Sequence, residues 1–176
     1  DAKKKLFDGR LGERPGTSVV NIDDEWGVLL ANDLVARGQR VVTFSQNGRA
    51  DLTAENIGVS LLSGTSFLLR TPVGDRDVHS PLVGRPHVYN MLAATAAALE
   101  LGYDLDLIVG GLSRCAGAPG RFERVQNDGD FAVVVDYAHT DDALLNTLRT
   151  ARALTEGRVI TVFGCGGDRD KTKRVP

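Results

Sequence analysis

The sequence has few cysteines, few aromatic residues and no long apolar run. Its only two cysteines, Cys115 and Cys165, lie far apart, which excludes a disulfide framework and favours a reducing compartment, the cytoplasm. The longest nearly apolar stretch, Ala93–Leu99, is well short of the roughly 20 residues that cross a bilayer, so we expect no membrane span. Basic residues (21) and acidic residues (23) almost balance. A protein that grips nucleic-acid phosphates usually carries a basic excess, so we expect no nucleic-acid partner.

The chain also has no initiator methionine and no signal-peptide pattern at its start, and Pro176 falls within a charged segment. We therefore expect the sequence to begin and end inside a longer protein. Its 176 residues are enough for one domain or for parts of two, at roughly 100–200 residues per domain.

The first half of the chain predicts two kinds of β-structure. A strand over Thr17–Ile22, a helix up to Ala36 and a strand over Val41–Phe44 form a strand–helix–strand unit, which is typical of parallel pairing. Between Ile57 and Val83, glycine and proline separate short β-rich stretches and indicate antiparallel hairpins, with strands over Val59–Leu62, Phe67–Arg70 and Val78–Val83.

The second half predicts helices and then a new unit. Pro86 suits the first turn of a helix that ends at Gly102, and a shorter helix covers Leu105–Leu112. The flexible segment Gly117–Gly120 is the best candidate for a domain boundary. Beyond it, a strand over Phe131–Asp136, a helix over Asp141–Leu154 and a strand over Arg158–Phe163 predict a βαβ unit that opens a doubly wound domain.

Two segments follow these last two predicted strands, and ligands of open α/β sheets gather at such strand ends. In Asp136–Thr140 an acidic side chain suits ribose hydroxyls, and in Gly164–Asp170 a glycine loop aims Arg169 at an anion. We expect both at one edge of the sheet. A structural alternative stays open, in which Asp136 and Thr140 cap the next helix and Asp168 pairs with Arg169.

Several nucleotide and metal motifs are missing. Gly164 and Gly166 begin a G-x-G pattern, but Arg169 replaces its third glycine, so the loop is no dinucleotide fingerprint. No G-x-x-x-x-G-K-[ST] phosphate loop occurs, and the three histidines lack metal-ligand spacing. Asn90 has an amide that suits a base edge, and Arg121 follows the boundary segment. The sequence alone favours a solvated polar residue for Asn90, and Arg121 is equally explained as an ordinary surface arginine.

Taken together, these segments resemble the Mur ligases of peptidoglycan synthesis. The likeness runs in order through five motifs: Ala2–Phe7, Gly84–Asn90, Pro119–Glu123, Val135–Thr140 and Phe163–Asp170. It implies an α/β fold, with residues 1–118 forming the C-terminal part of a central ATP-binding domain, a mixed sheet with helices. Residues 119–176 would then be the first βαβ unit of a Rossmann-like C-terminal domain that binds the amino acid.

The resemblance also implies a role for six positions. Lys3 matches a lysine carried as a carbamate that helps to hold Mg²⁺. Asn90 matches an adenine contact, Arg121 a hinge arginine that contacts the nucleotide, and Asp136 the ribose-binding aspartate, with His139 beside it. Arg169 matches the arginine that binds the carboxylate of the incoming amino acid. His87, where the family usually has Asn, weakens the adenine assignment, whereas Asp141 in place of proline suits a first helical turn equally well.

For the parent protein, the resemblance implies an ATP- and Mg²⁺-dependent amide ligase. Its substrates would be UDP-N-acetylmuramoyl-L-Ala-D-Glu and a diamino acid, meso-diaminopimelate or L-lysine, and it would be a cytoplasmic monomer. The present chain would be inactive by itself, because the phosphate loop would precede it. The alternatives are a Mur-type ligase that recycles peptide, a non-catalytic nucleotide-binding module, and a nicotinamide-dependent oxidoreductase, which the broken glycine pattern disfavours.

Overall fold

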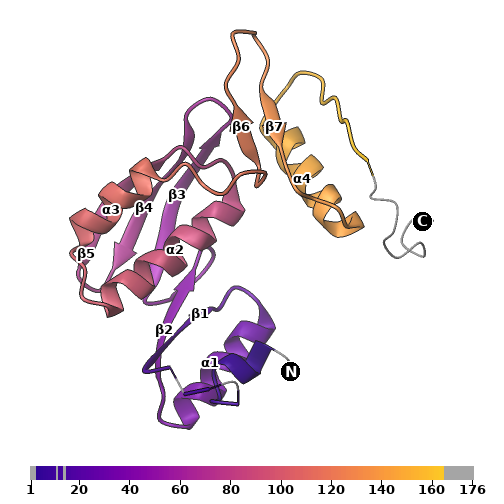
Figure 1. Ribbon diagram of the computed structural model, residues 1–176. Coiled ribbons are helices and arrows are strands. Elements are labelled where there is room, and N and C mark those ends of the chain that lie inside the picture. The colour runs from indigo at the N-terminus through magenta and orange to yellow at the C-terminus, as the bar shows by residue number, and fades with distance from the viewer. Residues whose placement is uncertain (1–2, 11, 14, 165–176) are drawn as a thin grey trace.

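A five-stranded mixed sheet forms the centre of the N-terminal part of the molecule (Figure 1). The structure is a computed structural model that describes residues 3–10, 12–13 and 15–164. The sheet order is β1-β2-β3-β4-β5, with strands β1 (Thr17–Asn21), β2 (Arg40–Ser45), β3 (Leu52–Ser60), β4 (Gly64–Thr71) and β5 (Gly74–Ser80). The pairs β1–β2 and β2–β3 are parallel, and the pairs β3–β4 and β4–β5 are antiparallel. The predicted parallel unit and the predicted hairpins are thus both confirmed.

Helix α1 (Glu25–Ala36) connects the two parallel strands β1 and β2. Asp24 begins the helix, because its carboxylate accepts the Gly27 backbone N–H at 2.9 Å. Gly27 lets the helix start close to β1, since a Cβ atom at this position would lie 1.8 Å from the Asn21 carbonyl oxygen. Gly38, at φ 71°, then turns the chain into β2.

The sheet has helices on both faces, and each face has its own apolar core. Helices α2 (Arg85–Glu100) and α3 (Leu105–Arg114) cover one face (Figure 1). Their core includes Leu52, Leu69, Val78, Val88 and Leu92. Val20, Ala31 and Leu34 form a smaller cluster between β1 and α1, and Phe7 packs against it just after the short 3₁₀ helix η1 (Lys3–Leu6).

The C-terminal part consists of a hairpin and one helix. Strands β6 (Glu123–Val125) and β7 (Val133–Val135) pair antiparallel, and α4 (Asp141–Ala153) follows. The sequence predicted β7 and α4 but not β6, which has only three residues, two of them charged. No helix in the described part of the chain is both long enough and apolar enough to cross a membrane.

The prediction of a strand over Arg158–Phe163 is wrong, because this segment forms no strand in the structure. The expected βαβ unit therefore lacks its second strand there. The segment has no regular structure, and its apolar side chains Ile160, Val162 and Phe163 are 76%, 94% and 72% exposed. A β-branched run becomes a strand only where a neighbouring backbone completes its hydrogen bonds. Within the described residues, β7 pairs with β6 alone.

Candidate functional site

Two loops that are distant in sequence are hydrogen-bonded to each other beside the β6–β7 hairpin. We call residues 120–122 and 136–139 the two-loop cluster. The backbone N–H of Tyr137 donates to the Gly120 carbonyl at 2.7 Å, and the N–H of Phe122 donates to the Asp136 carboxylate at 2.7 Å. The cluster therefore brings together three of the six predicted site residues, Arg121, Asp136 and His139.

Asp136 organises the cluster through both of its carboxylate oxygens. Oδ2 accepts the Phe122 N–H, while Oδ1 accepts the Ala138 N–H at 2.8 Å and the Thr147 hydroxyl of α4 at 3.2 Å. Phe122 is in the left-handed region at φ 47°, which is costly for a residue with a Cβ. A carboxylate accepts about four hydrogen bonds, so three bonds within the protein leave capacity for one more donor.

Arg121 and His139 both lie close to the Tyr137 ring. The Arg121 guanidinium carbon is 5.6 Å from the centre of this ring, and the His139 ring meets it edge-on with centres 4.9 Å apart. All three residues are exposed. The cluster therefore presents a cation and an imidazole to solvent, with the half-buried Asp136 carboxylate next to them.

The structural alternative for this loop is correct for one residue only. Thr140 caps α4, because its hydroxyl accepts the Ala143 N–H at 3.3 Å. Asp136 does not cap that helix, since it accepts backbone N–H groups from Phe122 and Ala138 instead. The alternative ion pair between Asp168 and Arg169 lies outside the described residues.

The other three predicted site residues are separate from the two-loop cluster or are not described. Asn90 is exposed in the second turn of α2. The start of this helix lies near α4, since a Cβ atom on Gly84 would be 3.6 Å from the Thr150 methyl group. Lys3 begins η1, but the structure describes no side chain for it. Arg169 lies outside the described residues, and so does the expectation that it shares a rim with Asp136.

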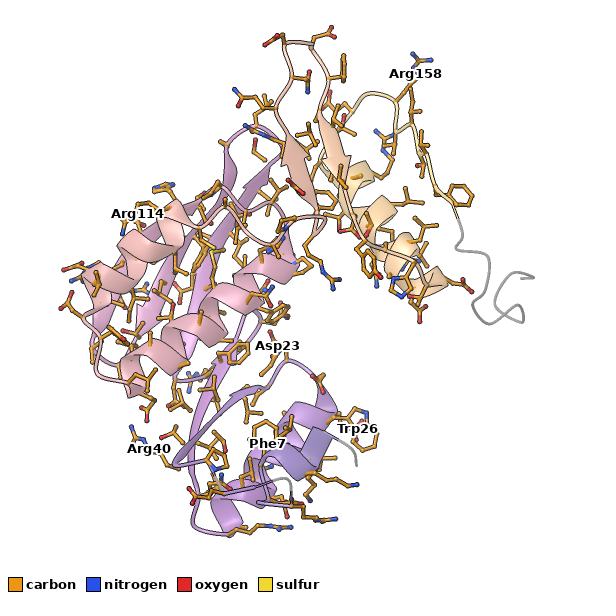
Figure 2. The ribbon with its side chains drawn as sticks, in the orientation of Figure 1. Phe7, Asp23, Trp26, Arg40, Arg114 and Arg158 are labelled. Carbon is orange, nitrogen blue, oxygen red and sulfur yellow. The ribbon has the colours of Figure 1, made fainter. Side chains whose placement is uncertain are left out.

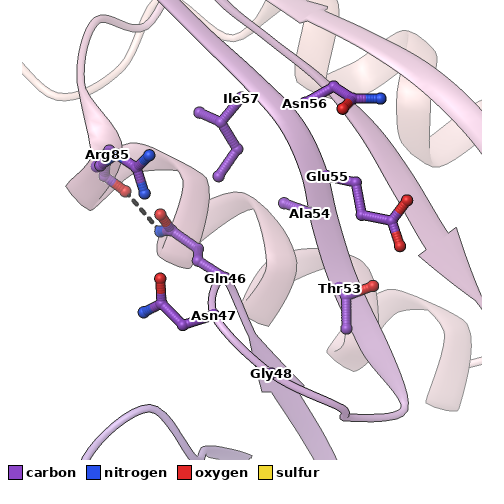
Figure 3. Close-up of a pocket in the computed structure, with 9 residues that line it drawn as sticks. All are labelled: Gln46, Asn47, Gly48, Thr53, Ala54, Glu55, Asn56, Ile57 and Arg85. Carbon is purple, nitrogen blue, oxygen red and sulfur yellow. Dashed lines mark hydrogen bonds between the residues drawn. The ribbon is translucent and has the colours of Figure 1, made fainter.

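Sequence reasoning missed a cavity at the carboxyl end of β2 (Figure 3). Its volume is about 540 Å³. The Gln46 side-chain amide donates to the Arg85 carbonyl at 2.8 Å and so links β2 to the start of α2. The cavity is lined by Gln46, Asn47, Gly48, Thr53, Ala54, Glu55, Asn56, Ile57 and Arg85.

Asp23 anchors the polar network behind this cavity and lies between α1 and α2 in Figure 2. Its carboxylate accepts the Ser45 hydroxyl and the Gln46 N–H, the latter at 2.7 Å. Burial alone would raise the pKa of Asp23, but hydrogen bonds from Ser45, Gln46 and Tyr89 outweigh burial and lower it. Burial and the nearby Asp23 raise the pKa of Tyr89. The network thus fixes the ends of β1 and β2 against α2.

A signal for this second site was present in the sequence. The rule that places ligands at strand ends applies to Ser45–Gly48 after β2 as much as to the loop after β7. The acidic pair Asp23-Asp24 comes just after β1. The structure divides its roles, since Asp24 caps α1 and Asp23 joins the strand ends.

Two family models match the chain and together cover most of it. The Mur ligase middle domain matches residues 1–98. The Mur ligase glutamate ligase domain matches residues 120–176.

Several curated relatives share one name, UDP-N-acetylmuramoyl-L-alanyl-D-glutamate–2,6-diaminopimelate ligase. The protein so named from Gloeobacter violaceus is 48% identical over 98% of this chain and 34% of its own length. The one from Alkaliphilus metalliredigens is 44% identical over 99% of this chain and 34% of its own length. A solved structure of a ligase with the same name matches with a TM-score of 0.72 at 36% identity, covering 98% of this chain and 35% of the other.

This chain spans about a third of the length of the curated relatives that it matches. The middle-domain match covers more than half of the 176 residues, and a second domain of the same family follows it in the same chain. The chain belongs to the Mur ligase family.

Proposed function

We propose that this chain is part of an ATP-dependent ligase that joins meso-diaminopimelate to UDP-N-acetylmuramoyl-L-alanyl-D-glutamate. The observation that carries the proposal is the 44–48% identity, over nearly the whole chain, to relatives named for this reaction. The sequence left open whether the amino acid is diaminopimelate or lysine, and the names of the relatives favour diaminopimelate. They also disfavour the peptide-recycling alternative.

Within this ligase, the two-loop cluster would bind the nucleotide. Arg121 carries a positive charge that suits phosphate oxygens, and no hydrogen bond or ion pair within the described residues engages its guanidinium. Asp136 can accept one further hydrogen bond, from a ribose hydroxyl. His139 contacts the same Tyr137 ring as Arg121 does. Asn90 would contact the adenine from α2, which begins close to α4.

The proposed reaction needs ATP because the oxygen of a carboxylate is a poor leaving group. Transfer of the γ-phosphoryl group to the substrate carboxylate gives an acyl phosphate and ADP. The amine of the incoming amino acid then forms the amide bond, and inorganic phosphate leaves. Arg121 would neutralise charge on the nucleotide, and Arg169 would hold the amino-acid carboxylate so that its amine faces the acyl carbon.

Among the proposed site residues, only Lys3 is assigned a role in holding Mg²⁺. In the part of the chain that the structure describes, no three His, Cys, Asp or Glu side chains gather to hold a metal ion. A carbamate on Lys3 would add one oxygen ligand of the kind that Mg²⁺ prefers. The remaining ligands would come from elsewhere in the ligase, and we derive no step through the metal.

We also propose a division into two domains, residues 1–118 and 119–176. The segment Cys115–Pro119 has neither helix nor strand and connects α3 to the two-loop cluster. Gly117 at φ 83° and Gly120 at φ 68° turn the chain there. Such a connection lets the nucleotide loops move as the second domain closes over the first. The ligase itself would be a cytoplasmic monomer.

The test is steady-state kinetics of the full ligase with ATP, the UDP-linked dipeptide and either diaminopimelate or lysine. Arg121→Ala should raise the ATP KM about tenfold, whereas Arg169→Ala should raise the amino-acid KM and leave the ATP KM nearly unchanged. Arg158→Ala, which removes an exposed arginine, is the matched control. Turnover with lysine but not diaminopimelate would overturn the specificity, and equal KM values in all three variants would overturn the assigned sites. Absence of any turnover would favour the non-catalytic module.

A further inference from the structure

Tyr137 is the residue that contacts both exposed groups of the two-loop cluster. Its ring lies 5.6 Å from the Arg121 guanidinium carbon and 4.9 Å from the centre of the His139 ring. The Tyr137 side chain is itself 55% exposed, so it adds little to an apolar core. Core packing therefore does not explain why the Tyr137 ring contacts Arg121 and His139.

An aromatic ring can hold an arginine without using its hydrogen-bond donors. A guanidinium carries five N–H donors in its plane, and attraction to the ring quadrupole acts through the ring face. A carboxylate partner would instead occupy two of these donors and neutralise the charge. Arg121 has the aromatic contact and, within the described residues, no carboxylate partner. Its donors therefore stay available to an anion.

The backbone of Tyr137 also orients His139. The His139 Nδ1 atom lies 2.9 Å from the Tyr137 carbonyl oxygen. A carbonyl oxygen only accepts hydrogen bonds, so Nδ1 carries the hydrogen in this contact. The other ring nitrogen, Nε2, is left for a ligand. Tyr137 thus sets the direction of both neighbouring groups.

The backbone of Tyr137 is hydrogen-bonded to the loop of residues 120–122. The Tyr137 N–H donates to the Gly120 carbonyl at 2.7 Å, directly before Arg121 in the chain. The adjacent Asp136 holds the Phe122 N–H, directly after Arg121. The residues before and after Arg121 are therefore both held by hydrogen bonds. The Arg121 side chain itself contacts only the Tyr137 ring among the interactions of the described residues.

We propose that Tyr137 is a positioning residue that holds the Arg121 guanidinium and the His139 imidazole in place for the nucleotide phosphates. This inference rests on the proposed function, because it assumes that Arg121 binds the nucleotide. It assigns the aromatic face, and not the phenolic hydroxyl, as the group that acts. Phenylalanine at position 137 should therefore keep nucleotide binding at the wild-type level, whereas leucine should weaken it.

The experiment compares Tyr137→Leu and Tyr137→Phe in the full ligase. The leucine variant should raise the ATP KM and the ADP Kd about three- to fivefold, as expected for an exposed cation–π contact, with the amino-acid KM unchanged. The phenylalanine variant should match the wild type. Tyr103→Leu is the matched control, because Tyr103 is also 55% exposed but lies between α2 and α3.

A double variant separates this inference from the proposed function. In an Arg121→Ala background, Tyr137→Leu should add little to the ATP KM, because the two residues act through one contact. If Arg121→Ala itself leaves the ATP KM unchanged, the nucleotide site assigned under the proposed function is wrong. If Arg121→Ala raises it but Tyr137→Leu does not, or if the two effects are fully additive, only the role of Tyr137 is overturned.

A second measurement applies even if Tyr137→Leu fails to fold. In the wild-type chain, the ring current of Tyr137 should shift the side-chain NMR signals of Arg121 upfield from those of the other exposed arginines. Tyr137→Phe should keep this shift. Arg121 signals at ordinary positions would show that the ring does not hold the guanidinium and would overturn the inference.

Discussion

Replacing Asp136 with Asn should release the loop that carries Arg121. The carboxylate accepts three hydrogen bonds, two at Oδ1 and one at Oδ2. The best orientation of an amide keeps its oxygen toward Ala138 and Thr147, and its NH₂ group then faces the Phe122 N–H. The variant loses one charge-assisted hydrogen bond and leaves a donor unpaired, a cost of about 2 kcal/mol.

This loss of free energy is similar in size to the backbone strain at Phe122, which the hydrogen bond offsets. Phe122 at φ 47° costs about 1–2 kcal/mol relative to an ordinary conformation. Without the Asp136 carboxylate, the loop has little reason to keep that conformation. A change of 2 kcal/mol corresponds to about a 30-fold change in a local opening equilibrium.

Amide hydrogen exchange at Phe122, measured at low protein concentration, checks this reasoning. Exchange in Asp136→Asn should be faster by about that factor of 30, while the amides of the central sheet should exchange as in the wild type. Asp128→Asn is the matched control, because Asp128 is exposed in the β6–β7 turn. Unchanged exchange at Phe122 in Asp136→Asn would refute the assigned hydrogen bond and the argument built on it.

Three further predictions concern stability. Gly27→Ala should destabilise the chain by about 1–3 kcal/mol in urea unfolding, because the new Cβ would lie 1.8 Å from a backbone oxygen; an unchanged midpoint would contradict the close approach of α1 to β1. Leu34→Ala, at a fully buried position, should cost about 2–5 kcal/mol, and Leu62→Ala, at an exposed one, less than about 0.5 kcal/mol. The lowered pKa of Asp23 means that its ionised form stabilises the fold above the unfolded-state pKa, and that this contribution is lost as pH falls through the folded-state pKa. The stability difference between wild type and Asp23→Asn should therefore shrink between pH 6 and pH 3, and a constant difference would be the contrary result.

Local sequence patterns predicted most of the N-terminal sheet and its helices. The strand–helix–strand unit, the antiparallel hairpins and the helix at Pro86 depend on period, proline and glycine signals, which act over a few residues. Strand β3 begins at Leu52, earlier than predicted. Its first residues pair with β2, and such pairing between strands does not show in a local pattern.

Non-local contacts explain what the sequence could not predict at the C-terminal end and in the site. Strand β6 forms because Arg124 and its neighbours pair with β7, and its single apolar residue, Val125, is too little to predict a strand. Residues 158–163 also carry a strand signal, but no backbone in the described part of the chain pairs with them. In the site, residue type and position singled out Asp136 and Arg121, and the resemblance to the Mur ligases added His139. The contacts of Tyr137 and Phe122 needed the fold, because they join loops that are far apart in the sequence.

The exposed run around Ile160 and Val162 affects how the chain behaves in solution. It lies in the same part of the molecule as β7, which among the described residues is hydrogen-bonded to a strand on one side only. An apolar segment together with a free strand edge provides a template for another molecule. We expect the purified 176-residue chain to self-associate as its concentration rises. Its apparent mass would then report association through this exposed surface and not the oligomeric state of the proposed full-length ligase.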